Sequence, residues 1–511
     1  MGRRKRGGGA LALGAAAAGL AAGAAPAGAL DNGLGRTPPM GWNSWNRFHC
    51  EVSEDLIRAQ AEALVASGLR DAGYTFLNVD DCWMAEERNA DGDLEAHPER
   101  FPSGIRHLSD YVHSLGLKFG LYSSAGHLTC AGFPAGMGHE ARDAARYAEW
   151  GVDYLKYDNC HSGGVPPQER FAAMSEALNA TGRPIVFSMC EWGVDGPWEG
   201  WAAPLANVWR TTPDIRPAWD SVSEIVDRNE PLYAAAGPGA FNDPDMLEVG
   251  NPGLTDTEAR AHFSLWAMMK APLLAGCDLA NLTAAARSIL GNAEVIAVNQ
   301  DALGVQGRVV KRQNHPDFGA LEVWAAPLED GDLAVLLFNR DDDLQGPKRT
   351  IEVLWEDIGL PGGAPAAVRD LWEQADMGAH PNGYRSEVPA HGVAMLRVQA
   401  EACNEVESEA CNAVKHHINH HFKLRPAQEL AVSQSQVGRL AADLGEKWHF
   451  IVAGGLAAVA VSAAAVANVR SRERRQMLLP RVVGAMGVGG YGGYEAVRSQ
   501  FVAHTLADGS P

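Results

Sequence analysis

Short apolar runs alternate with longer amphipathic stretches between residues 36 and 300. Each run ends in polar or aromatic residues, and the stretch that follows has apolar positions at helical spacing. This alternation predicts strands separated by helices. The eight predicted strands are residues 41–45, 75–81, 118–123, 153–158, 185–191, 207–211, 241–246 and 273–278.

The clearest amphipathic stretches between these strands are residues 54–68, 140–150, 168–178, 219–228 and 257–270. Eight strands with helical spacers in about 260 residues favour an α/β fold, a parallel (β/α)8 TIM barrel over residues 31–305. A doubly wound open sheet is the structural alternative, and it is less favoured because eight units close naturally into a barrel.

The pattern changes after the barrel. Strict alternation of apolar and polar positions, divided by Gly, Pro and Asp, predicts an antiparallel β domain over residues 306–399. Residues 400–449 are predicted to form a polar helical linker, in which Cys403 and Cys411 are close enough to form a disulfide. The predicted β runs are residues 320–324, 333–338, 349–355, 368–372 and 393–398.

The first thirty residues have the layout of a secretory signal peptide. Four basic residues at positions 3–6 precede an Ala/Leu/Gly run, and small residues at 25–29 offer cleavage sites. The alternative is a disordered Ala/Gly tail. Removal of a leader would start the chain near Asp31 in an oxidising compartment, which permits disulfides. The expected location is then extracellular, vacuolar or lysosomal, with candidate glycan sites at Asn179 and Asn281.

Residues 450–469 form a second segment that suggests a membrane. They carry no charge, and four arginines follow within six residues, as at the cytoplasmic end of a transmembrane helix. Alanine and glycine dominate the stretch, so a soluble Ala-rich helix is the alternative. A span would leave residues 31–449 in the lumen or outside, and the basic, Gly-rich tail 470–511 in the cytoplasm, without structure.

Composition narrows the class of protein. The chain has 511 residues, 43 Lys and Arg against 63 Asp and Glu, and a net charge of -20. This balance argues against a nucleic-acid binder, which would need a basic patch. At 46% hydrophobic residues, the chain can bury a large core.

Charged and polar side chains gather where the predicted strands end. In a parallel barrel these carboxyl ends converge on one face, where active sites lie. Tryptophans among them suit a sugar, although ordinary core packing is the alternative for each one. Glycoside hydrolysis needs two carboxyl groups, and spacing alone does not choose the pair. The strand-end residues are Asp80, Asp81, Tyr122, Lys156, Asp158, Glu191, Arg210, Asp214, Asp243 and Asp245, with Trp42, Trp45, Trp83, Trp192 and Trp209.

Seven motifs at these strand ends together resemble the α-galactosidases of glycoside hydrolase family twenty-seven (melibiase type). The resemblance runs in order from about residue 34 to residue 398, and it implies a (β/α)8 barrel followed by an antiparallel β-sandwich. The motifs are GWNSW at 41–45, NVDDCW at 78–83, GLYS at 120–123, YLKYDNC at 154–160, CEW at 190–192, WRTTPD at 209–214 and NDPDM at 242–246.

The resemblance also implies roles. Asp158 would be the nucleophile that forms a covalent galactosyl-enzyme, and Asp214 the acid and then the base, so that terminal α-galactosides are hydrolysed with retention. Lys156, two residues before Asp158 on the same strand face, favours the ionised nucleophile, whereas Asp214 needs surroundings that raise its pKa. The implied substrate-binding residues are Trp45, Asp80, Asp81, Tyr122, Lys156, Glu191, Trp192 and Arg210.

The family resemblance implies disulfides between Cys50 and Cys82 and between Cys130 and Cys160. Cys190 and Cys277 have no obvious partner and are expected to be buried free thiols. A homodimer is a further expectation. No cofactor or metal is expected, because no His/Cys cluster and no phosphate-binding glycine loop is found at the strand ends.

The family resemblance also implies a specificity. Relatives that accept α-N-acetylgalactosamine carry small residues after the fifth strand, so the bulky Glu191, Trp192 and Val194 predict its rejection. Asp81 argues against the β-L-arabinopyranosidase branch, in which this aspartate is replaced. A galactose-binding protein without catalysis is one alternative, which the two aspartates disfavour. The histidines at 416, 417, 420 and 421 suggest a metal clip on a helix, but a solvated histidine-rich surface is favoured over it.

Overall fold

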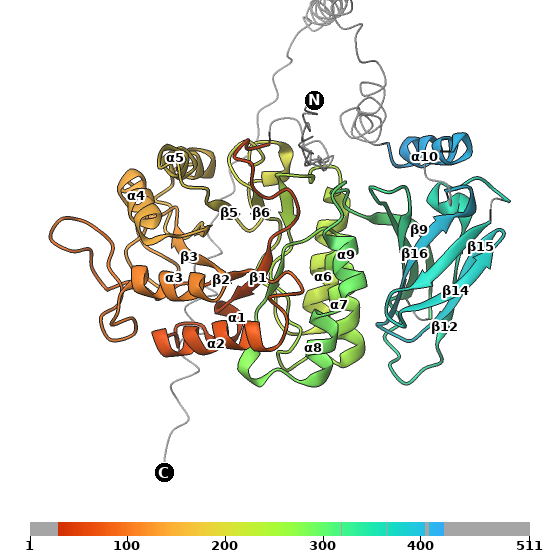
Figure 1. The fold of residues 1–511 in the computed structure, drawn as a ribbon, viewed down its shortest axis with the longest axis horizontal. Coiled ribbons are helices and arrows are strands. Elements are labelled where there is room, and N and C mark those ends of the chain that lie inside the picture. The colour runs from red at the N-terminus through yellow and green to blue at the C-terminus, as the bar shows by residue number, and fades with distance from the viewer. Residues whose placement is uncertain (1–28, 318, 364, 404–407, 424–511) are drawn as a thin grey trace, which may run out of the picture. The chain divides into compact units, whose positions relative to one another are not determined.

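The computed structural model describes residues 29–317, 319–363, 365–403 and 408–423. All eight predicted strands are present and parallel (Figure 1). All but β3 are shorter than the predicted runs, mainly because polar residues at the carboxyl ends lie outside the sheet, whereas β3 extends one residue further. The strands are β1 (Met40–Asn43), β2 (Phe76–Asn78), β3 (Lys118–Ser124), β4 (Tyr154–Asp158), β5 (Val186–Cys190), β6 (Val208–Arg210), β7 (Phe241–Asp243) and β8 (Leu273–Ala275).

The sheet closes into a barrel. Its order is β7-β6-β5-β4-β3-β2-β1-β8, so β7 and β8 are the two ends. Leu247, just beyond β7, donates its main-chain N–H to Leu274 at 2.8 Å and accepts from Gly276 at 3.0 Å. These bonds join the ends, which excludes the open doubly wound sheet.

Helices follow the strands and cover the outside of the barrel. The five predicted helices are confirmed, and α1, α3, α8 and α9 are additional. Two helices begin at residues that cap helix N-termini well. Ser53 caps α2, and Thr255 with Glu258 forms a capping box at α7, where such a cap stabilises the fold by about 1 kcal/mol. The helices are α1 (Trp45–Phe48), α2 (Glu54–Ala66), α3 (Ile105–Ser114), α4 (Glu140–Trp150), α5 (Pro167–Ala180), α6 (Trp219–Asn229), α7 (Asp256–Met268), α8 (Ala284–Leu290) and α9 (Ala293–Asn299).

The second domain is antiparallel, as predicted. Its larger sheet has the order β14-β13-β16-β11-β10-β9, and β12 pairs with β15 in a smaller sheet. Three strands, β9, β14 and β15, were not predicted because they carry many exposed polar residues and show little apolar alternation. The strands are β9 (Arg308–His315), β10 (Gly319–Pro327), β11 (Leu333–Asn339), β12 (Arg349–Leu354), β13 (Ala366–Asp370), β14 (Ala375–His380), β15 (Gly383–Val388) and β16 (Val393–Ala400).

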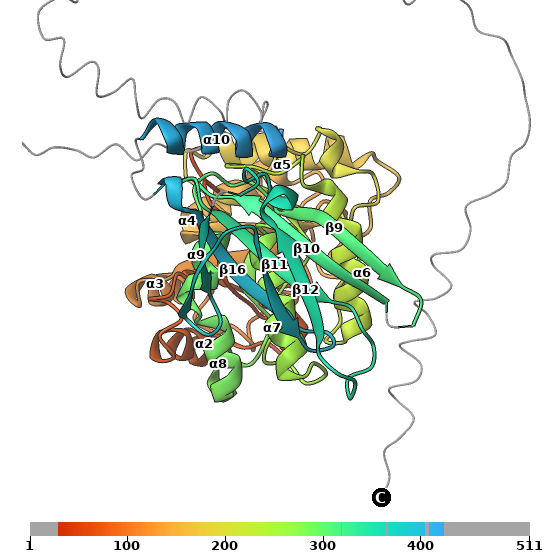
Figure 2. The same ribbon diagram turned by 90° about the vertical axis from the view of Figure 1, so that its right-hand side faces the viewer.

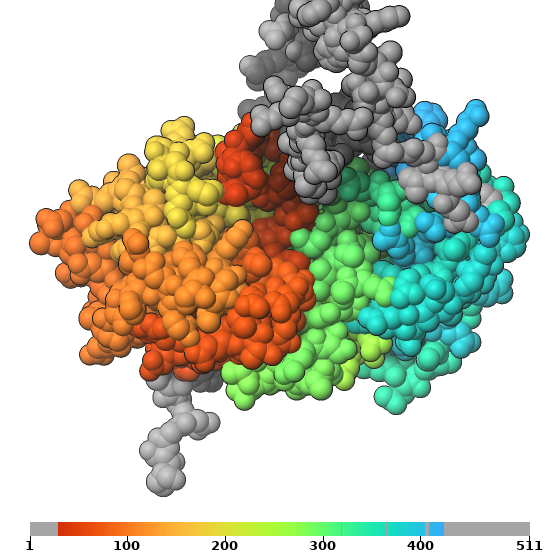
Figure 3. Space-filling view, in the orientation of Figure 1, coloured from red at the N-terminus to blue at the C-terminus, as the bar shows by residue number. Residues whose placement is uncertain are grey.

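Polar contacts tie this domain to α7 of the barrel. The indole N–H of Trp372 donates to the Ser264 hydroxyl at 2.9 Å, and His391 Nδ1 lies 2.7 Å from Glu258 Oε1. The imidazole of His391 also stacks on Trp219, with ring centroids 4.4 Å apart. Figure 3 shows the two domains in contact in a space-filling view.

The described part of the segment 400–449 contains one α-helix, α10 (Glu409–Phe422). Figure 2 shows this helix lying across one end of the second domain. Its apolar side, with Val414, Ile418 and Phe422, is buried in the core of that domain, and Cys411 is joined to Cys403. The described part of the predicted linker, residues 400–403 and 408–423, thus packs as part of the second domain.

Three disulfides are present, Cys50 with Cys82, Cys130 with Cys160, and Cys403 with Cys411, and Cys190 and Cys277 are buried free thiols, all as expected. In the described ranges, no helix has the length and apolar character needed to cross a bilayer. The predicted signal peptide lies outside the described residues for all but its last two positions, and the predicted span 450–469 and the tail 470–511 lie wholly outside them.

Candidate active site

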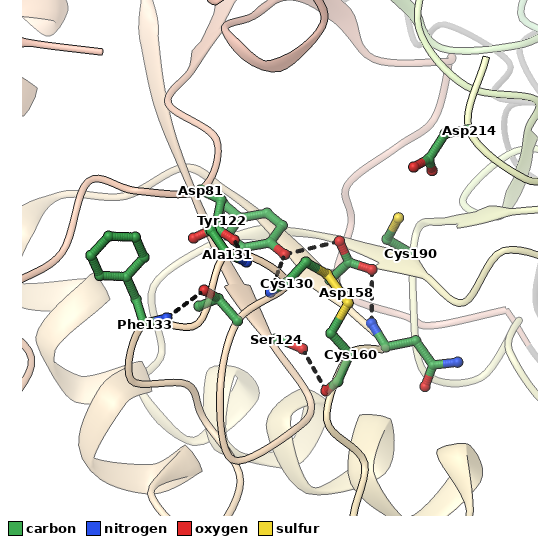
Figure 4. The surroundings of a disulfide bond; sticks show 12 residues. Asp81, Tyr122, Ser124, Cys130, Ala131, Phe133, Asp158, Cys160, Cys190 and Asp214 are labelled. Atoms are coloured by element: carbon green, nitrogen blue, oxygen red, sulfur yellow. Dashed lines mark hydrogen bonds between the residues drawn. A yellow bond between two sulfur atoms is a disulfide. The ribbon is translucent and has the colours of Figure 1, made fainter. Parts of the chain in front are cut away.

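Asp158 is the last residue of β4 and is 94% buried at the mouth of the barrel. Its Oδ2 accepts a hydrogen bond from the Tyr122 hydroxyl at 2.9 Å, and its Oδ1 accepts the main-chain N–H of Asn159 at 2.8 Å. Tyr122 lies on the neighbouring strand β3. Figure 4 shows both bonds holding the carboxylate in one orientation. Each oxygen retains a lone pair, so the group can still attack an electrophile.

Burial raises the pKa of Asp158 to about 6, although Lys156 and the N–H of Asn159 lower it and Asp214 raises it further. The effect of Lys156 on the pKa of Asp158 therefore has the direction that the sequence predicts. The larger effect on this pKa is the removal of the carboxylate from water.

Asp214 lies in the loop between β6 and α6, and 60% of its side chain is exposed. Its Oδ1 is 3.2 Å from Arg210 Nη2. In Figure 4 the two carboxylates lie near each other, with the Cys190 thiol beside them. One carboxyl group is thus buried and rigidly held, and the other is open to solvent. The raised pKa expected for Asp214 stays a prediction.

Asp80 and Lys156 form a buried ion pair, with Lys156 Nζ 2.8 Å from Asp80 Oδ2. The same oxygen accepts from Asn43 Nδ2 at 2.7 Å. Asn43 in turn uses its Oδ1 to accept the main-chain N–H of Trp45 at 2.8 Å. Asn43 was not selected from the sequence, although it lies inside the GWNSW motif. Its role depends on the adjacency of β1 and β2, which spacing along the chain does not show.

Asp81 is also buried and is held by main-chain donors. Its Oδ1 accepts the N–H of Cys82 at 2.7 Å, and its Oδ2 accepts the N–H of Ala131 at 2.9 Å. Burial raises the pKa of Asp81, and the charge of Asp80 adds to this against the lowering effect of the two donors. The donor from Ala131 comes from the loop that contains Cys130, so the second disulfide supports this part of the mouth.

Asp245 organises the loop that carries Asp214. Its Oδ2 accepts the main-chain N–H of Ile215 at 2.8 Å and lies 2.9 Å from Arg210 Nη2. Its backbone has φ 82°, a strained region for a residue with a side chain. Burial raises the pKa of the neighbouring Asp243 to about 6, against the lowering effect of Arg210. Both aspartates were found at the strand end, but their supporting role was not predicted.

Three of the five tryptophans are core residues, which matches the alternative weighed for each. Trp42, Trp83 and Trp209 are buried, and their indole N–H groups donate to protein acceptors at 2.7, 2.8 and 3.0 Å. Trp45 and Trp192 are only partly buried. These two are therefore the tryptophans available to a ligand at the mouth.

Glu191 is completely buried after β5, and its Oε1 accepts the main-chain N–H of Asp195 at 2.9 Å in its own loop. Burial raises the pKa of Glu191 to about 7. Trp192 follows with φ 63°, and Val194 is 69% exposed. Glu191 thus shapes this loop, and its contact with a substrate stays a prediction.

Cys130, Asp158 and Cys160 place three potential metal-ligating atoms close together. The two sulfurs are bonded to each other, so they cannot act as thiolate ligands. The chemistry of the mouth is therefore that of carboxylates, one lysine and one arginine.

Comparisons with known proteins agree with this geometry. A family model described as alpha galactosidase A matches residues 37–301, and a model of the alpha galactosidase C-terminal beta sandwich domain matches residues 318–398. Alpha-galactosidase 3 of Arabidopsis thaliana is 52% identical over 367 residues, which are 72% of this chain and 82% of the relative.

Solved structures give the same result. Alpha-galactosidase I from Mortierella vinacea is similar with a TM-score of 0.68 and 39% identity, covering 72% of this chain and 98% of that one. An alpha-galactosidase from Saccharomyces cerevisiae, solved with raffinose, has a TM-score of 0.67 and 35% identity, covering 72% and 99%.

Proposed function

Because the chain belongs to the α-galactosidase family of glycoside hydrolases, we propose that it hydrolyses terminal α-D-galactosides with Asp158 as nucleophile and Asp214 as acid and base. The observation that carries this assignment is the contrast between two nearby carboxyl groups. One is buried and fixed by Tyr122 and Asn159, and the other is exposed on a loop. Such unlike surroundings are what two different roles require.

In the first step an Asp158 oxygen attacks the anomeric carbon of the galactosyl group. The bond from that carbon to the leaving oxygen breaks, and Asp214 gives its proton to this oxygen. In the second step Asp214, now a carboxylate, takes a proton from water, whose oxygen attacks the same carbon and releases Asp158. Two inversions give net retention, so α-galactose is formed first.

We propose that the buried charges hold the sugar. Asp80, with Lys156 bonded to it, and Asp81 would accept hydrogen bonds from the 4- and 6-hydroxyls, and Lys156 would donate to the 3- and 4-hydroxyls. Arg210 would donate to the 2- and 3-hydroxyls, and Trp45 would pack on an apolar face. The existing bonds of Asp80 and Asp81 support this, because they fix the carboxylates before a sugar arrives.

The direct test of this function compares two aryl glycosides. We expect p-nitrophenyl α-galactoside to be cleaved much faster than its N-acetylgalactosaminide, because the residues that follow β5, Glu191, Trp192 and Val194, are bulky where small residues would make room for an acetamide. Proton NMR of the first turnovers should show α-galactose before mutarotation. Binding of galactose without turnover would instead favour the non-catalytic alternative.

The pH profile should reflect the nucleophile. Asp158 attacks only when ionised, so we expect kcat/KM to fall about tenfold per pH unit below a pKa of about 6. Lys156→Met removes a charge that lowers this pKa, so the acidic limb of the profile should move to higher pH. The profile is measured with p-nitrophenyl α-galactoside at substrate concentrations far below KM. An acidic limb that stays in place in Lys156→Met would contradict the electrostatic account.

We also propose that the protein enters the secretory route, with a leader at residues 1–30 and a membrane anchor at 450–469. The three disulfides support an oxidising compartment, and the side chains of Asn179 and Asn281 are exposed, as glycan acceptors must be. Retention in the membrane pellet after alkaline carbonate would support the anchor, and release would refute it. A homodimer, expected from the sequence, would show in light scattering of the purified protein.

A further inference from the structure

A hydrogen bond links the helix that carries Trp45 to the segment between β7 and β8. Asn46, the second residue of α1, donates its side-chain N–H to Glu248 Oε1 at 2.7 Å. Glu248 has only 1% of its surface exposed. Glu248 is shielded from bulk water, so it cannot exchange this partner for solvent, although Asn46 itself is partly exposed.

Glu248 is enclosed by further contacts, and Asn46 is packed on one side. The second carboxyl oxygen of Glu248 accepts from Asn251 Nδ2 at 2.6 Å, and Asn251 also donates to the main-chain oxygen of Gly276 at 3.2 Å. Gly276 passes so close that a Cβ on it would lie 3.0 Å from the Cβ of Asn46. The side chain of Asn46 therefore has one position, between Gly276 and Glu248.

Trp45 is held from its other side as well. Its main-chain N–H donates to Asn43, which is bonded to Asp80, and its indole packs against the apolar cluster that contains Met246. Helix α1 is a single turn, and Ser44 gives it no side-chain cap. One turn is not stable by itself, so these tertiary contacts must determine where the indole lies.

We propose that Asn46 and Glu248 are positioning residues that fix the indole of Trp45 against the bound galactosyl group, which rests on the proposed function. They touch no reacting atom. Loss of the bond would free the middle of α1 on the β8 side, while the Asn43 contact would hold its first residue and the packing of Phe48 on Trp42 would hold its last. Sugar binding should weaken, and the chemical step should change little, because Asp158 and Asp214 lie on other elements.

The test measures kcat and KM for p-nitrophenyl α-galactoside and the inhibition constant of galactose. We expect Asn46→Ala to raise KM and the inhibition constant together, by about fivefold or more, with kcat within about twofold. Glu248→Leu should do the same. Glu248→Gln should fall between the parent and Glu248→Leu, because its amide oxygen can still accept from Asn46 while its NH2 group would face the donor Asn251 Nδ2. Arg47→Ala, an exposed position on the same helix, is the matched control and should leave all three constants unchanged.

A second background separates positioning from general damage. In Trp45→Ala the indole is gone, so adding Asn46→Ala should not raise the galactose inhibition constant further. An equal factor in both backgrounds, or a loss in kcat alone, would overturn the proposal. These outcomes require a parent that hydrolyses the substrate. A parent without turnover would contradict the proposed function itself, so the two failures are distinguishable.

Discussion

Asp158→Gly should lower kcat for p-nitrophenyl α-galactoside by about 10⁴-fold or more, because it removes the group proposed to form the galactosyl intermediate. The change removes the carboxylate that Tyr122 and Asn159 hold in place. Azide should enter the space left by the side chain and attack from the same side, restoring turnover. Its product should be β-galactosyl azide, since only one displacement occurs. The product is identified by NMR.

Asp158→Asn is the control for this experiment. It preserves the size of the side chain, so it should fold and bind galactose, but azide should not rescue it because no space is created. If either variant retains more than about a tenth of the parental kcat, another residue must be the nucleophile.

Asp214→Ala should produce an effect that depends on the leaving group. For raffinose, whose leaving alcohol needs a proton, kcat/KM should fall by about 10³-fold. For 2,4-dinitrophenyl α-galactoside, whose leaving group departs as an anion, kcat/KM should change only a few fold. Hydrolysis of the intermediate then limits kcat, because no base activates water. Azide needs no base to attack the intermediate, so it should raise kcat and give α-galactosyl azide, the product with retained configuration.

Asp220→Ala is the matched control for Asp214. Asp220 is an exposed aspartate six residues further along the chain, paired with Arg216 instead of Arg210. It should leave both substrates unaffected. Equal losses for raffinose and the dinitrophenyl galactoside in Asp214→Ala would show that Asp214 supports the fold or the sugar site rather than proton transfer.

The eight strands and the residues at their ends could be predicted because buried parallel strands leave a strong pattern and their carboxyl ends converge on one face. The spacing of residues along the chain did not reveal that Asn43 contacts Asp80, or that Asp245 supports the loop that carries Asp214. Both roles arise from contacts between different strands and loops, at Asp80 and at Ile215. A linear pattern carries no information about such pairings.

The sequence pattern also does not show how deeply a given side chain is buried. The charge of Lys156 was visible two residues before Asp158, and its lowering effect on the pKa was predicted correctly. The pKa is nevertheless raised, because Asp158 lies inside the mouth and desolvation outweighs the lysine. The same limit applies to α10. Its polar composition predicted a linker, whereas Val414, Ile418 and Phe422 pack in the core of the second domain.

The central claim is that a covalent bond forms at Asp158. A fluorinated α-galactosyl fluoride that forms the intermediate faster than it is hydrolysed tests this claim most directly. After inactivation and proteolysis, mass spectrometry should find one added fluorogalactosyl group on the peptide containing Asp158, and excess galactose should slow the labelling. A label on the peptide containing Asp214, or turnover with no labelled peptide and an inverted product, would contradict the account.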